Sequence, residues 1–199
     1  MFLLFGLLVP PAWAEERPED IAARIVDQVG ERQVERWLMA PDWPVDDIIE
    51  IAYGYAPSQA LTAEAIDYYV QHQRAKARAR AMEDLLIADL DADLTVTGAE
   101  IGAIALALSG HARGLLWTRQ RRADLDADGR VDLAELRLFA DRRAMRYLSE
   151  GRALALGNLM ALDLDGDGQV AVAEAERALV LLNRAVRAAQ AAGYRPEDA

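Results

Sequence analysis

Carboxylate side chains recur at fixed places in three twelve-residue segments of the chain. Each segment has Asp at positions 1, 3 and 5 and Glu at position 12, and the three align without gaps. Alternating aspartates on a tightly curled chain converge on one point, and Ca²⁺ takes six to eight oxygen ligands at about 2.3–2.6 Å. The pattern therefore predicts a calcium-sized oxygen cage in each segment. The segments are residues 89–100 (DLDADLTVTGAE), 124–135 (DLDADGRVDLAE) and 163–174 (DLDGDGQVAVAE).

The predicted ligands occupy equivalent positions in the three segments. Position 7 offers its backbone carbonyl, and the Glu at position 12 offers both carboxylate oxygens, which favours calcium over the octahedral Mg²⁺. Position 9 usually holds a water, a role that suits Asp132. The predicted ligands are Asp89, Asp91, Asp93, Thr95, Glu100, Asp124, Asp126, Asp128, Arg130, Asp132, Glu135, Asp163, Asp165, Asp167, Gln169 and Glu174.

The curl requires a residue that tolerates positive φ at position 6. Gly129 and Gly168 meet this need, whereas the first segment has Leu94 there. A leucine at positive φ costs on the order of 1–2 kcal/mol. We therefore expect the first site to be weaker or distorted, and whether it binds metal usefully stays open.

These segments resemble the calcium-binding loops of the EF-hand family, whose pattern is D-x-[DN]-x-[DN]-G-x₅-E. The second and third segments match it completely, and the first departs only at position 6. The resemblance implies a helix on each side of every loop. It also implies a short strand contact between paired loops at the aliphatic position 8, which is Val96, Val131 and Val170.

Apolar spacing supports helices beside the loops. Residues 101–108 and 175–182 place apolar side chains at i, i+3, i+4 and i+7, which is one face of a helix. Ser109-Gly110 should separate the helix that leaves the first loop from the helix that enters the second.

EF-hands usually occur in pairs, so three loops suggest a fourth. One period before Asp89, residues 53–64 place Glu64 at the closing position but lack the aspartates. This stretch is either a degenerate hand that pairs with the first loop and binds nothing, or a plain helix–turn–helix connection. The expected fold is all-α with two lobes, and we expect the second lobe to bind calcium first and more tightly. The expected parts are a signal peptide (1–14), a leader helix (15–44), an N-terminal EF-hand pair (45–110), a C-terminal pair (111–190) and a tail (191–199).

The N-terminus has the features of an export signal. Residues 1–14 (MFLLFGLLVPPAWA) are apolar, shorter than the roughly 20 residues of a membrane-spanning helix, and end in a small-x-small pattern. We expect cleavage after Ala14 and a periplasmic or secreted protein; the alternative is a short buried helix.

Arginine supplies nearly all of the basic residues, and Lys76 is the only lysine, which indicates a bacterial source of high GC content.

Composition excludes several other functions. The net charge of −11 disfavours nucleic acid and anionic lipid as partners. The absence of cysteine excludes disulfides and thiol chemistry. No phosphate loop, Ser-His-Asp set or histidine–metal cluster is present, so no enzyme is predicted.

The basic stretch of residues 74–80 is either a solvated helix surface or a site for an anion or partner.

The sequence thus predicts a protein that binds two or three Ca²⁺ ions. It would act as a sensor with a protein partner on a calcium-dependent surface, as a buffer, or as a calcium-stabilised interaction module. The alternative is a lanthanide-binding protein resembling lanmodulin. That family has proline at loop position 2 and closely spaced loops, whereas this chain has Leu90, Leu125 and Leu164 and wide spacing.

Overall fold

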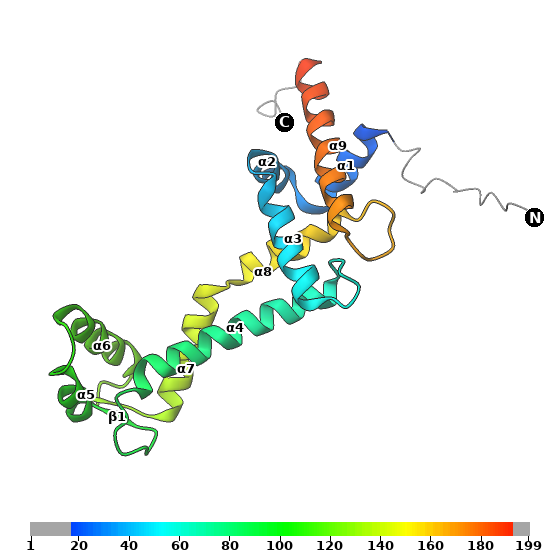
Figure 1. Cartoon of the computed structure of the whole chain (residues 1–199). Coiled ribbons are helices and arrows are strands. Elements are labelled where there is room, and N and C mark those ends of the chain that lie inside the picture. The colour runs from blue at the N-terminus through cyan, green and yellow to red at the C-terminus, as the bar shows by residue number, and fades with distance from the viewer. Residues whose placement is uncertain (1–16, 193–199) are drawn as a thin grey trace, which may run out of the picture. The chain divides into compact units, whose positions relative to one another are not determined.

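The computed structural model describes residues 17–192. Within them the chain forms nine α-helices, one 3-10 helix and a two-stranded sheet, so the predicted all-α class is confirmed (Figure 1). None of the described helices is long and apolar enough to cross a membrane. The expected signal peptide (1–14) and residues 193–199 of the expected tail lie outside the described residues.

The described residues divide into two compact units. Unit one comprises residues 17–69 and 154–192, and unit two comprises residues 70–153. The expected boundary between residues 110 and 111 is therefore wrong. One unit joins two stretches that are distant in the sequence, whereas the other is continuous.

Unit one is built around the last helix, α9 (Val172–Ala191), which contacts α1, α2 and α3. Leu179 and Leu182 of α9 are buried. The other elements of this unit are α1 (Pro18–Val29), α2 (Glu31–Met39), α3 (Asp42–Tyr55), the first turns of α4 (Ala63–Leu86), the end of α8 (Glu150–Gly157) and the 3-10 helix η2 (Asn158–Leu162).

The expected single leader helix over residues 15–44 is wrong. Helices α1 and α2 and the start of α3 occupy this region, and Gly30, with φ of 81°, breaks the chain between α1 and α2. Their apolar faces are part of the core, since Ile25 and Trp37 are buried. A second break occurs at Pro41, which precedes α3, as its proline predicts. Pro44 lies in the first turn of α3, where a missing N–H costs no helical hydrogen bond.

Unit two packs its helices around one buried cluster that includes Leu85, Ile101, Leu116, Leu136 and Phe139. Its helices α5 (Gly98–Ala105) and α6 (Gly110–Ala123) are joined by residues 106–109. The Ser109 hydroxyl caps α6 by accepting a hydrogen bond from the N–H of Ala112 (3.3 Å). The expected break at Ser109-Gly110 is thus confirmed. The elements are the rest of α4, β1 (Val96–Thr97), α5 (Gly98–Ala105), α6 (Gly110–Ala123), β2 (Arg130–Val131), α7 (Leu133–Tyr147) and the start of α8.

Loops one (89–100) and two (124–135) lie side by side in unit two. Strand β1 runs antiparallel to β2, with Val96 opposite Val131, so these loops meet at the predicted aliphatic position. In unit one, Val170 of loop three (163–174) instead forms two backbone hydrogen bonds with Leu61 (2.9 and 2.8 Å). The expected pairing of loop two with loop three, and of loop one with the segment before it, is therefore wrong. Within unit two, α5 packs against α6 and α6 against α7, so loops one and two belong to one packed set of helices.

Candidate metal-binding site

Carboxylate oxygens converge at three of the predicted ligand positions in every loop. The oxygens from positions 1, 3 and 12 lie within 4.8 Å of one another. Such a spacing is compatible with three ligands around one cation. The three groups are Asp89, Asp91 and Glu100; Asp124, Asp126 and Glu135; and Asp163, Asp165 and Glu174.

Backbone hydrogen bonds to these carboxylates hold the curl of each loop. The Asp at position 1 accepts the N–H of position 6 through Oδ2, at 3.1, 3.0 and 2.9 Å in loops one, two and three. The Glu at position 12 accepts the N–H of position 2 through Oε1, at 2.9, 2.6 and 2.7 Å. The repeated pattern gives the three loops one local conformation, which explains why their carboxylates gather in the same way.

The aspartates at position 5 are not part of the gathered groups. Their Oδ1 atoms accept the backbone N–H of position 7, at 2.6 Å from Thr95, 2.8 Å from Arg130 and 2.7 Å from Gln169. Each of these carboxylates retains a second oxygen that could reach a metal. Ligation by position 5 and by the carbonyl of position 7 stays a prediction.

Backbone strain differs among the loops. Position 6 has the predicted positive φ in all three, and position 4 has it too, which sequence reasoning missed. Loop three places Gly166 and Gly168 there, whereas loop one places Ala92 and Leu94 at φ of 61° and 65°. The extra glycine of loop three, Gly166 at position 4, was the feature of the sequence that could have predicted this conformation. Because a non-glycine residue at positive φ costs on the order of 1–2 kcal/mol, loop one is the most strained and loop three the least.

Two carboxylate oxygens within the described residues are buried without a hydrogen-bond partner at these sites. They are Oδ1 of Asp89 and Oδ1 of Asp124, both at position 1. In loop three the corresponding oxygen of Asp163 accepts the N–H of Gly166 (2.7 Å). A buried charged acceptor with no partner is costly, and a hard cation is the partner that an all-oxygen donor set fits. The residues present therefore fit Ca²⁺.

The closing glutamates of loops one and three have opposite pKa shifts. The N–H and hydroxyl of Thr97, with the N–H of Leu90, hold the pKa of Glu100 below its ordinary value because they stabilise the charged form. Burial raises the pKa of the Glu174 carboxyl despite its backbone hydrogen bonds.

Helix α1 explains why loop three is the more buried one. Leu164 at position 2 is 3% exposed, whereas its counterpart Leu90 is 58% exposed. The guanidinium of Arg24 on α1 donates a hydrogen bond to the carbonyl of Leu164 (3.5 Å). Sequence reasoning missed this contact, since no local pattern links residues 140 positions apart.

Position 9 starts the helix that follows each loop. The carboxylate of Asp132 accepts the N–H of Glu135 (2.9 Å), and the Thr97 hydroxyl does the same for Glu100 (3.3 Å). The structure therefore gives Asp132 a helix-capping role, while the predicted water-holding role stays a prediction.

The bridge to loop three aligns the segment around residues 53–64, expected as a degenerate hand or a plain connection, with the positions of that loop. Because Leu61 faces Val170 at position 8, the equivalent loop runs from residue 54 to 65, and Ala65 takes the closing position. The expectation that Glu64 occupies it is wrong by one residue. The hydroxyl of Thr62 accepts the N–H of Ala65 (3.1 Å), just as position 9 does in loop one.

Comparison with known proteins finds no matching family model, no matching curated protein and no matching solved structure.

Proposed function

We propose that this chain is an EF-hand protein that binds two or three Ca²⁺ ions. The proposal is carried by the gathered carboxylates of positions 1, 3 and 12, which recur in all three loops. The unpartnered buried oxygens of Asp89 and Asp124 support a cation as the missing partner in loops one and two. Bound Ca²⁺ would supply positive charge where these carboxylates repel one another.

The loops differ in how well they suit the ion. We propose that loops two and three bind more tightly than loop one, because loop one keeps two non-glycine residues at positive φ. Segment 54–65 lacks carboxylates at the closing position and at positions 1, 3 and 5, so it acts as the metal-free partner of loop three.

The stabilisation expected from calcium is modest at each site. At about 1 mM Ca²⁺ and a dissociation constant of about 0.1 mM, typical of extracellular EF-type modules, one site adds roughly 1.4 kcal/mol. Three ions would bring the formal charge from −11 to about −5. We further propose that the chain is exported from a bacterium, on the strength of residues 1–14, and that it acts as a sensor, a buffer or a calcium-stabilised interaction module.

Calorimetric titration with Ca²⁺, Mg²⁺ and La³⁺ tests the proposal. We expect calcium binding in the range of about 10⁻⁶–10⁻³ M and much weaker magnesium binding. Glu135→Gln combined with Glu174→Gln should remove most of the calcium heat. Glu64→Gln is the matched control, because this glutamate lies outside the closing position and its replacement should leave the heat unchanged.

Two results would count against the proposal. Unchanged stoichiometry in the Glu135→Gln, Glu174→Gln double variant would show that the assigned ligands are wrong. Picomolar binding of La³⁺ with negligible binding of Ca²⁺ would instead favour the lanthanide-binding alternative.

A further inference from the structure

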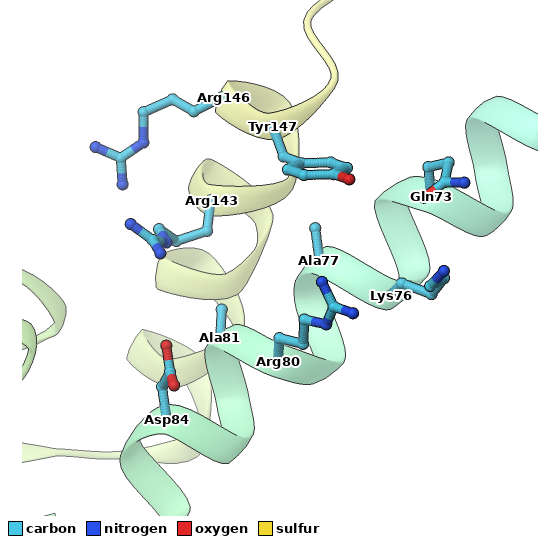
Figure 2. Close-up of a pocket in the computed structure, with 9 residues that line it drawn as sticks. All are labelled: Gln73, Lys76, Ala77, Arg80, Ala81, Asp84, Arg143, Arg146 and Tyr147. Atoms are coloured by element: carbon cyan, nitrogen blue, oxygen red, sulfur yellow. The ribbon is translucent and has the colours of Figure 1, made fainter. Parts of the chain in front are cut away.

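A cationic pocket lies between α4 and α7 within unit two (Figure 2). Its volume is about 410 Å³, and four of its lining residues are basic. This is unexpected in a chain with a net charge of −11. We call Lys76, Arg80, Arg143 and Arg146 the pocket cations.

The pocket cations are not neutralised by the protein. Within the described residues none of them has an ion pair or a side-chain hydrogen bond, although acidic residues are close by in the sequence. The acid in the pocket, Asp84, is paired with Arg119 of α6 (3.1 Å). Arg78 on α4 is likewise paired with Asp141 on α7. Both acids are thus paired with arginines that do not line the pocket, and four basic side chains without an acidic partner line the cavity.

The pocket also contains a buried polar side chain. Gln73 is 8% exposed, lines the cavity and has no hydrogen-bond partner within the described residues. Its amide is not among the side-chain atoms that are buried without a partner, so the amide is accessible to a molecule bound in the cavity. The Tyr147 ring extends from α7 toward α4 beside Ala77 and brings a hydroxyl to the pocket, and the small side chains of Ala77 and Ala81 line it on α4 (Figure 2).

We propose that this pocket binds a small organic anion that carries two phosphoryl or carboxylate groups. Figure 2 shows one pair of pocket cations on each helix: Lys76 and Arg80 on α4, and Arg143 and Arg146 on α7. Guanidinium groups bind phosphate and carboxylate through two parallel hydrogen bonds, so each pair suits one anionic group. Gln73 and Tyr147 would bind the uncharged part of the molecule, and the volume is within the range of small-molecule sites.

Calorimetry with two soluble probes tests this proposal in the full-length protein at about 1 mM Ca²⁺. The probes are fructose 1,6-bisphosphate and glutarate, which carry two phosphoryl and two carboxylate groups respectively, with fructose as the uncharged control. We expect one saturable site for at least one of the two anions, weakened by added salt, and no binding of fructose. The preferred probe identifies the anionic group.

A pair of double variants separates the pocket from general charge. Arg80→Gln with Arg143→Gln removes one cation from each helix and should weaken binding at least about tenfold. Arg137→Gln with Arg142→Gln removes the same charge from α7 outside the pocket and should change it by less than about twofold. Circular dichroism and the calcium titration verify that both variants remain folded.

Three results would overturn the proposal. They are the absence of saturable binding for both anions, equal weakening in the two double variants, and binding only to vesicles of phosphatidylcholine with phosphatidylglycerol. The last result would assign the pocket to a membrane surface instead. Because calcium heat is measured separately, failure of the anion site leaves the calcium proposal intact.

Discussion

Replacing Leu61 with alanine should destabilise unit one by about 3 kcal/mol. The Leu61 side chain is 0% exposed, and its backbone is held to Val170 of loop three. Removing buried methyl groups costs both their transfer free energy and that of the cavity left behind, about 2.7–5 kcal/mol for fully buried leucines. The two backbone hydrogen bonds remain possible, so the estimate lies at the lower end of this range.

Urea unfolding measures this loss. In a Trp117→Phe background the tryptophans of the described residues, Trp37 and Trp43, both belong to unit one, so their fluorescence reports on that unit. Calorimetry on the same variant should show weaker calcium binding at one site only, because loops one and two belong to unit two.

Leu154→Ala is the matched control in unit one, since that side chain is 70% exposed and its loss should cost less than about 0.5 kcal/mol. A loss below about 1 kcal/mol for Leu61→Ala would refute the reasoning. Weakened binding at loop one, with loop three unaffected, would also refute it, because it would support the pairing expected from sequence.

Three further predictions concern the loops and the helices beside them. Gly168→Ala should lower the free energy of unfolding by about 1–2 kcal/mol, because φ at this position is 82°. Gly157→Ala should raise the free energy of unfolding by up to about 1 kcal/mol, because φ there is −58° and the space around it is open. Urea unfolding measures both changes. As the pH falls, loop three should release calcium at a higher pH than loop one, because burial raises the pKa of Glu174 while hydrogen bonds lower the pKa of Glu100. Calorimetry across a pH series measures the order of release, and the reverse order would contradict this reasoning. Thr97→Ala should cost about 1 kcal/mol and raise the pKa of Glu100 toward its ordinary value, and an unchanged pKa by NMR titration would contradict the capping contact.

The candidate site was predictable because its determinants are local. Aspartates at alternate positions and a glutamate at position 12 fall within twelve residues, and backbone hydrogen bonds inside the same segment hold them. The positive φ at Gly129 and Gly168 followed from the same local requirement. The position 4 conformation was missed because alanine, found there in two loops, has no preference that would indicate it.

The partners of each loop, by contrast, depend on contacts between distant residues. Repeats counted along the chain suggested neighbours in pairs from the N-terminus, yet Val96 meets Val131 and Val170 meets Leu61. Local composition cannot distinguish these pairings, because every loop offers a similar aliphatic residue at position 8. The choice is made by the packing of α6 against α5 and α7 in unit two, and of α9 against α1, α2 and α3 in unit one.

The sequence alone therefore determines where oxygen ligands gather and which loop is most strained, since both are properties of twelve consecutive residues. Tertiary packing decides which loops pair. It buries Glu174 and so raises its pKa, whereas the pKa of Glu100 is lowered. It also brings four basic residues of α4 and α7 to the lining of one cavity. These features require residues up to 140 positions apart to meet, and no local pattern of side chains encodes such a meeting.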